Sequence, residues 1–166
     1  ITIMSPNAAI AVEDFSAWMG RDDFYVYKGG VSTLPCTVKQ YVFSDMNQDQ
    51  TQKICCGVNS AFSEIWWFYP SSSSTENDRY VVWNYTNNLW YYGNLPRTAW
   101  LDRGIKNNPI GASDDKYLYS HELGLDDGST VPASAISSFI ESSQVDIGQG
   151  DQFSFVSRVI PAVSYT

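Results

Sequence analysis

The chain has 166 residues, of which 43% are hydrophobic, 15% aromatic and 17% charged, and its formal net charge is −8. This length and composition are typical of one folded domain, or part of one, and exclude a disordered segment. The ten Lys and Arg residues are scattered singly, which excludes a surface that grips duplex nucleic acid through clustered cations.

Short strands are predicted along the whole chain, because aromatic and β-branched residues alternate with Gly, Pro, Asn and Ser. Residues 39–58 are expected to form a strand, a polar hairpin turn at DMNQD and a second strand. Residues 79–95 are predicted to form an antiparallel hairpin with its tip at Thr86-Asn87-Asn88. Only residues 133–143 have a helical pattern. All the predicted strand segments are residues 23–30, 39–58, 64–70, 79–96, 116–124 and 153–160.

An internal repeat is visible in the two segments GRDDFYVYKGG (20–30) and ASDDKYLYSHELG (112–124). Between them Glu64 opens an aromatic strand, and 41 and 51 residues separate it from Asp23 and Asp115. A second register pairs 39–50 with 78–89, and a fainter fourth copy opens at Asp151. A period of about 40–50 residues with four strands per unit is typical of a β-propeller.

We therefore predict an all-β fold of β-propeller-like repeats, each a short antiparallel four-stranded sheet. The units are expected at 15–60, 61–111 and 112–150, with a partial unit at 151–166. About three and a half blades cannot close a ring, so the missing blades would lie on further sequence or on another chain. The absence of an initiator Met and of a signal-peptide pattern fits a fragment of a longer polypeptide.

Aromatic residues that bury a large apolar area are expected at the contacts between blades. A binding surface for sugar or peptide is the alternative interpretation of the same residues. The residues assigned to packing between blades are Trp66, Trp67, Tyr80, Trp83, Trp90 and Tyr91.

Catalytic patterns are weak in this sequence, and we expect no enzyme activity. His121 is the single imidazole and no G-x-S-x-G elbow is present, so Ser-His-Asp chemistry has little support. A glycoside hydrolase would need two carboxylates held a few ångströms apart. The repeated Asp-Asp pairs suit turns better than a single site. The candidate carboxylates are Glu64, Asp78, Asp102, Asp114, Asp115 and Glu122.

The three cysteines are Cys36, Cys55 and Cys56, an odd number in which the neighbours could bridge only with strain. We expect three reduced thiols and folding in a reducing cytoplasm. No CxxC pair occurs and one histidine cannot complete a zinc site of the usual kinds, so we expect no metal or other cofactor. No apolar stretch reaches the roughly 18 residues of a membrane helix, so no membrane span is expected.

Residues 64–104 (EIWWFYPSSSSTENDRYVVWNYTNNLWYYGNLPRTAWLDRG) resemble the repeated blade of structural tail proteins of tailed bacteriophages. Tail-hub or nozzle proteins of short-tailed phages, including packaged-DNA stabilisation proteins, are the family indicated. SHELGLDDGS and FIESSQVDIGQGDQFSFVSRVIP extend the resemblance.

That resemblance implies a virion protein made in the bacterial cytoplasm, without catalytic residues, in a ring-shaped homo-oligomer below the portal. Its implied partners are other tail or portal subunits and the passing genome DNA, bound without specificity. A negative surface is compatible with that role, because it would let DNA slide. An aromatic-faced propeller that binds carbohydrate or peptide, and a carboxylate-dependent glycoside hydrolase, remain the alternatives.

Overall fold

The structure is a computed structural model that describes residues 2–126, 131–132 and 134–136. The chain divides into two units, Ile1–Gly124 and Leu125–Thr166. In the second unit, Asp126 and Ala135 form an antiparallel bridge. Four sequence predictions lie wholly or mostly outside the described residues. They are the strand at 153–160, the partial unit at 151–166, the repeat copy at Asp151 and most of the helical pattern at 133–143.

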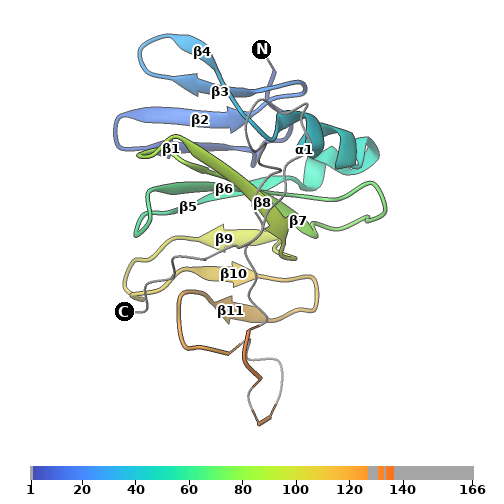
Figure 1. Ribbon diagram of the computed structural model, residues 1–166, viewed down its shortest axis with the longest axis vertical. Coiled ribbons are helices and arrows are strands. Elements are labelled where there is room, and N and C mark those ends of the chain that lie inside the picture. The colour runs from blue at the N-terminus through green and yellow to red at the C-terminus, as the bar shows by residue number, and fades with distance from the viewer. Residues whose placement is uncertain (1, 127–130, 133, 137–166) are drawn as a thin grey trace, which may run out of the picture. The chain divides into compact units, whose positions relative to one another are not determined.

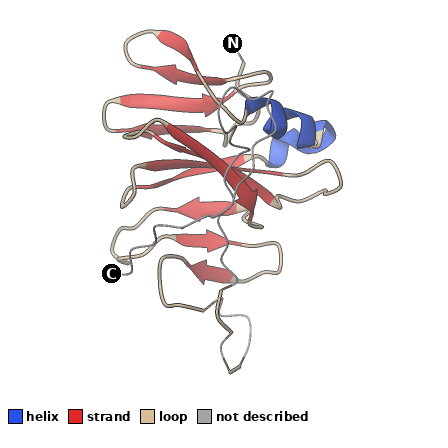
Figure 2. Ribbon diagram, viewed as in Figure 1, coloured by secondary structure: helices blue, strands red, loops and turns tan. Residues whose placement is uncertain are grey.

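The first unit is all-β, as predicted, and contains three antiparallel sheets (Figures 1 and 2). The first sheet consists of β1 (Ala9–Val12), β2 (Phe15–Met19), β3 (Phe24–Tyr27) and β4 (Val31–Leu34). The second sheet consists of β5 (Cys55–Asn59), β6 (Glu64–Tyr69), β7 (Arg79–Asn84) and β8 (Leu89–Asn94). The third sheet consists of β9 (Ala99–Leu101), β10 (Ile110–Ala112) and β11 (Leu118–Ser120).

Each sheet is a meander, because every strand pairs with its neighbour in the chain. The β7–β8 hairpin confirms the hairpin predicted for residues 79–95, with Trp83 paired to Trp90 and Asn84 to Leu89. Its turn closes through side chains: Asn84 Oδ1 accepts a hydrogen bond from the Asn87 N–H (2.9 Å). Asn88 adopts a φ of 53°, which asparagine tolerates better than most residues.

The three sheets follow one another within the first unit, and the second sheet lies between the other two (Figure 1). Their first strands lie side by side, since β1 contacts β5 and β5 contacts β9. A parallel bridge between Asn7 and Cys55 ties the entry to β1 to β5. The hydrophobic core fills the space between the first and second sheets, around Phe24, Trp67 and Val81.

The strand and hairpin turn predicted within residues 39–53 are wrong. These residues form the helix α1 (Lys39–Asp45) and the 3-10 helix η1 (Gln48–Lys53) instead (Figure 2). Their apolar residues serve a helix face: Val42 is fully buried. Asn47 Oδ1 caps η1 by accepting the Asp49 N–H (3.0 Å). The repeat alignment of 39–50 with 78–89 is therefore wrong, because the first segment contains the helix α1 and the second contains the strand β7.

Tertiary contacts explain why this strand-like sequence is helical. The Phe43 ring packs against Phe24 at 5.6 Å. Lys39 Nζ pairs with Asp23 Oδ2 at 2.5 Å, and Arg79 Nε pairs with Asp45 Oδ2 at 3.1 Å. These contacts attach both ends of α1 to the first and second sheets, and such packing outweighs the weak intrinsic preference of a short segment.

The repeat has a clear structural position in the sheets. Asp22-Asp23 and Asp114-Asp115 both precede the third strand of their sheets, β3 and β11. The equivalent residues of the second sheet are Asn77-Asp78, before β7, whereas Glu64 begins the second strand, β6. Glu64 is therefore not the middle copy of the repeat. The shared pattern is Asp/Asn-Asp-x-Tyr, at 22–25, 77–80 and 114–117, and it is less visible in 77–80 because Asn77 replaces the first aspartate.

The sheets also divide the chain at different points from the expected units. Residue 60 lies between β5 and β6, which pair with each other, and residue 111 lies inside β10. Periodicity fixes the length of a repeat but not which strand is its first, so a shifted frame fits the sequence equally well.

Candidate functional site

The six aromatic residues assigned to packing lie on both faces of the second sheet. Directly paired residues of an antiparallel sheet share a face. By this register, Trp67, Trp83 and Trp90 point toward the first sheet. Tyr80, Trp66 and Tyr91 lie on the opposite face, toward the third sheet.

The face toward the first sheet is centred on Trp67, which is fully buried. Its ring lies 5.1 Å from Phe24, and its indole N–H donates to the Ala8 carbonyl at 3.0 Å. Trp90 also contacts Phe24, at 4.8 Å, but it is only half-buried, and its indole N–H donates to the Pro35 carbonyl (2.9 Å). Trp83 is buried against Phe15 at 5.7 Å.

The face toward the third sheet is organised by Trp100, which the sequence interpretation did not single out. Its ring stacks on Trp66 at 5.5 Å with an interplanar angle of 10°. Its indole N–H donates to the Val58 carbonyl (2.9 Å). A Cβ at Gly57 would lie 2.2 Å from Trp100 Cδ1, so only glycine leaves room for this ring. A glycine inside an aromatic strand is the signal that could have indicated such a close approach.

Tyr91 differs from the other five residues because it lies at the surface, 37% exposed. Its hydroxyl donates to Glu64, which also accepts the Trp66 indole N–H at 2.9 Å. Burial, and then the hydrogen bond to Glu64, raise the pKa of Tyr91 well above its ordinary value. Tyr91 therefore stays a neutral donor to a surface carboxylate.

The candidate carboxylates form two separate groups at opposite ends of the second and third sheets. Glu64, Asp102 and Glu122 lie at the end of β6 and β9 where the β5–β6 turn is found. Asp78, Asp114 and Asp115 lie at the other end. The six carboxylates therefore form two groups of three and do not all meet at one site.

These carboxylates accept hydrogen bonds that hold the chain in place. Asp78 accepts the Ser71 N–H (2.6 Å) and hydroxyl (2.7 Å), which orders the serine-rich loop. Asp102 Oδ1 accepts the backbone N–H of Ser60 at 3.2 Å. Asp115 accepts the Tyr119 hydroxyl at 2.5 Å, and this bond lowers the pKa of Asp115.

His121 belongs to a compact polar cluster on the inner face of the third sheet. Arg97 is only 7% exposed, and its Nε–H donates to His121 Nε2 at 2.9 Å. The guanidinium lies 4.3 Å from the Tyr119 ring centre, and the His121 ring lies 4.6 Å from that of Trp100. Burial, and then the Arg97 charge, lower the pKa of His121 to about 4. The imidazole is therefore neutral at pH 7.

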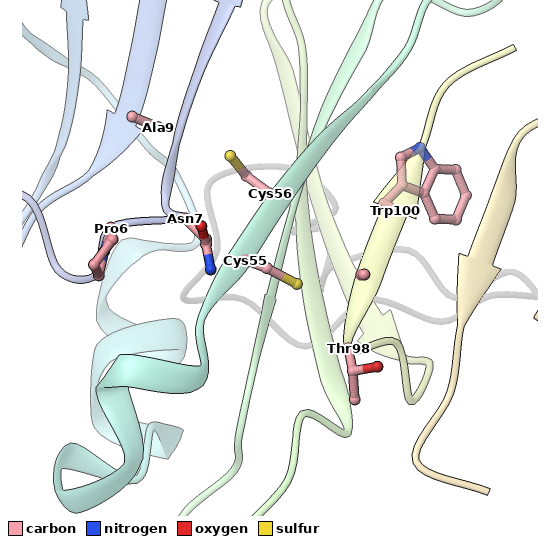
Figure 3. Close-up of a pocket in the computed structure, with 8 residues that line it drawn as sticks. Pro6, Asn7, Ala9, Cys55, Cys56, Thr98 and Trp100 are labelled. Carbon is pink, nitrogen blue, oxygen red and sulfur yellow. The ribbon is translucent and has the colours of Figure 1, made fainter. Parts of the chain in front are cut away.

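A shallow pocket of about 360 Å³ lies where the first strands of the three sheets meet (Figure 3). Cys55 and Cys56 point to opposite sides of β5 there (Figure 3). All three cysteines are free thiols, and burial raises the pKa of Cys55 to about 11 and of Cys56 to about 12. Thiols in this state are poor nucleophiles at neutral pH. The pocket is lined by Pro6, Asn7, Ala9, Cys55, Cys56, Thr98, Ala99 and Trp100.

Comparison with known protein families and with curated proteins finds no match. Within the described residues, no group of three or more His, Cys, Asp or Glu side chains could hold a metal ion. No helix in this part of the chain is long and apolar enough to cross a membrane.

Proposed function

We propose that this chain is a structural component of a tailed-bacteriophage virion, and that it contributes propeller-like blades to the tail hub or nozzle. One observation carries the structural part of this proposal: three meander sheets stack through aromatic layers, with their first strands side by side. Consecutive blades of a propeller have this arrangement. The placement in a phage tail rests on the sequence resemblance of residues 64–104.

The outward face of the third sheet supports continuation of the stack. By register it lies opposite Trp100, and it carries the small or apolar side chains Ala99, Leu101 and Leu118. Leu101 is 67% exposed and Leu118 is 74% exposed. Such a face is an expected contact for a further blade, supplied by another subunit or by more of the same polypeptide.

The chemistry of the chain agrees with a passive role toward DNA. The net charge of −8 favours weak contact with a passing genome over binding. The proposed partners are other tail or portal subunits in a ring-shaped homo-oligomer, and no catalytic activity is assigned.

Sedimentation of the native polypeptide tests this proposal. The wild type is expected to form a ring-sized oligomer, and Leu118→Glu is expected to dissociate it while the circular dichroism spectrum is unchanged. Leu89→Glu, on the second sheet, is the matched control, because Leu89 is also exposed (59%). A wild type that stays monomeric at all concentrations, or a control that dissociates equally, would contradict the proposal.

A binding module for carbohydrate or peptide is the second candidate, and exposed Tyr91 beside Glu64 favours it. Tyrosine next to a carboxylate can stack on a sugar ring and bind its hydroxyls. Saturable quenching of tryptophan fluorescence by an oligosaccharide, lost in Tyr91→Ala, would support this candidate over the structural one.

A further inference from the structure

The third sheet has less apolar packing than the other two. Its strands are only three residues each. The hydrophobic core cluster contains residues of the first and second sheets and of the segments next to them, and none from β9, β10 or β11. The third sheet packs on the second through the Trp100 ring, with the cluster of Arg97 and His121 next to that ring. Hydrogen bonds from Ser60 to Asp102 and from Asn59 to Glu122 add to this contact.

The hydrogen bond between Arg97 and His121 fixes the protonation state of the imidazole. Arg97 Nε can only donate, so His121 Nε2 must accept and the ring must be neutral with its proton on Nδ1. Arg97 cannot lose its own charge in this pH range. Protonation of His121 Nε2 would remove the acceptor and place two cations 2.9 Å apart.

Little space is available for the pair to relieve this repulsion. A Cβ at Gly111 would lie 2.6 Å from Arg97 Cδ and 2.9 Å from His121 Nε2, so the strand β10 is in close contact with both side chains. The Tyr119 ring covers the guanidinium, and Trp100 covers the imidazole. Among the described residues, the other titratable groups that act on Arg97 are Tyr119, Asp115 and Asp114, and the Cys55 thiol lies against the Arg97 carbonyl.

The geometry points to an acid-sensitive latch: protonation of His121 separates it from Arg97 and opens the third sheet, while the first and second sheets stay closed. His121 is the single histidine of the chain, so few other groups titrate between pH 7.5 and 5. The hydrogen bond from Tyr119 holds the pKa of Asp115 low, so its charge persists over this range. A protein loosened locally by acid would change its contacts at the outward face of the same sheet.

The sign of the pH effect follows from the two states of His121. The pKa is about 4 in the closed state and 6.5 for a solvated imidazole. The closed state is thus fully stabilised above pH 6.5 and loses this stabilisation as the pH falls toward 4. At pH 5 these values give up to about a 30-fold increase in the opening equilibrium relative to pH 7.5. Partial solvent exposure of the ring reduces this to roughly tenfold.

Hydrogen exchange of the native polypeptide at pH 7.5 and 5.0, corrected for intrinsic rates, tests the latch. Amides of residues 97–121 are expected to exchange roughly tenfold faster at pH 5.0 in the wild type. His121→Gln keeps an acceptor for Arg97 but does not titrate, so its exchange should not respond to pH. Equal acceleration in the first and second sheets, or the same response in His121→Gln, would overturn the proposal.

If His121→Gln does not fold, the titration of His121 in the wild type tests the latch. The ¹H–¹³C signal of the His121 imidazole in the wild type should titrate well below pH 6.5. A midpoint at 6.5 or above would show that acid does not disfavour the closed state, and it would overturn the latch even if the structural role of the chain holds.

Discussion

Trp67 is the residue whose loss should damage this fold most, and Trp90 is its natural comparison. Both rings lie on the same face of the second sheet and both contact Phe24, but Trp67 is fully buried whereas Trp90 is half-buried. A buried tryptophan removes roughly 200 Å² from water, which at about 25 cal/mol/Å² is worth about 5 kcal/mol. Trp67→Ala should therefore lower the free energy of unfolding by about 4–5 kcal/mol. It also removes one of the two hydrogen bonds that the Ala8 carbonyl accepts, the other coming from the Met19 N–H.

Trp90→Ala should cost about 1–3 kcal/mol, because part of its ring already faces solvent. Urea unfolding followed by circular dichroism gives both values from the same linear extrapolation. Since a loss of 5 kcal/mol could unfold the chain outright, Trp67→Phe provides a milder variant that keeps most of the apolar area. If Trp90→Ala destabilises as much as Trp67→Ala, the assignment of Trp67 to the centre of the core is wrong.

Three further predictions concern packing, turns and thiols. Gly57→Ala should lower the free energy of unfolding by several kcal/mol, because the added Cβ meets Trp100. Gly104→Ala should be nearly neutral, since no atom lies within 4 Å of a Cβ there. Thermal melts of the two variants measure the difference. Asp78→Ala should cost about 1–3 kcal/mol in urea unfolding by freeing the Ser71 N–H, and exposed Asp49→Ala far less. Alkylation at pH 8 should be slow in the native protein, because burial raises the pKa of every cysteine. In denaturant it should reach three thiols per chain. Fast labelling of the native protein would contradict this prediction.

Sequence patterns predicted the strands well where local signals and packing agree. Residues 64–70 and 79–96 carry aromatic residues bounded by proline and an Asn-Asn turn, and they form β6 and the β7–β8 hairpin. The prediction failed at 39–53, where apolar residues suit a strand or a helix equally. The helix is selected by distant partners, the Phe24 ring for Phe43 and Asp23 for Lys39.

The site was predictable in kind but not in detail. The abundance of tryptophan indicated aromatic packing, yet the contact between Gly57 and Trp100 joins strands that are far apart in sequence. The cluster of Arg97 and His121 has no sequence signature, because the neutral state of His121 arises from burial and from a hydrogen bond between two segments far apart in sequence.

Electron cryo-microscopy of the native polypeptide tests the central claim most directly. If the three sheets are blades of a propeller-like scaffold, another sheet of a closed ring is predicted to cover the outward face of the third sheet, which includes Leu101 and Leu118. A map in which this face remains open to solvent, or in which the three sheets stand alone, would contradict the account.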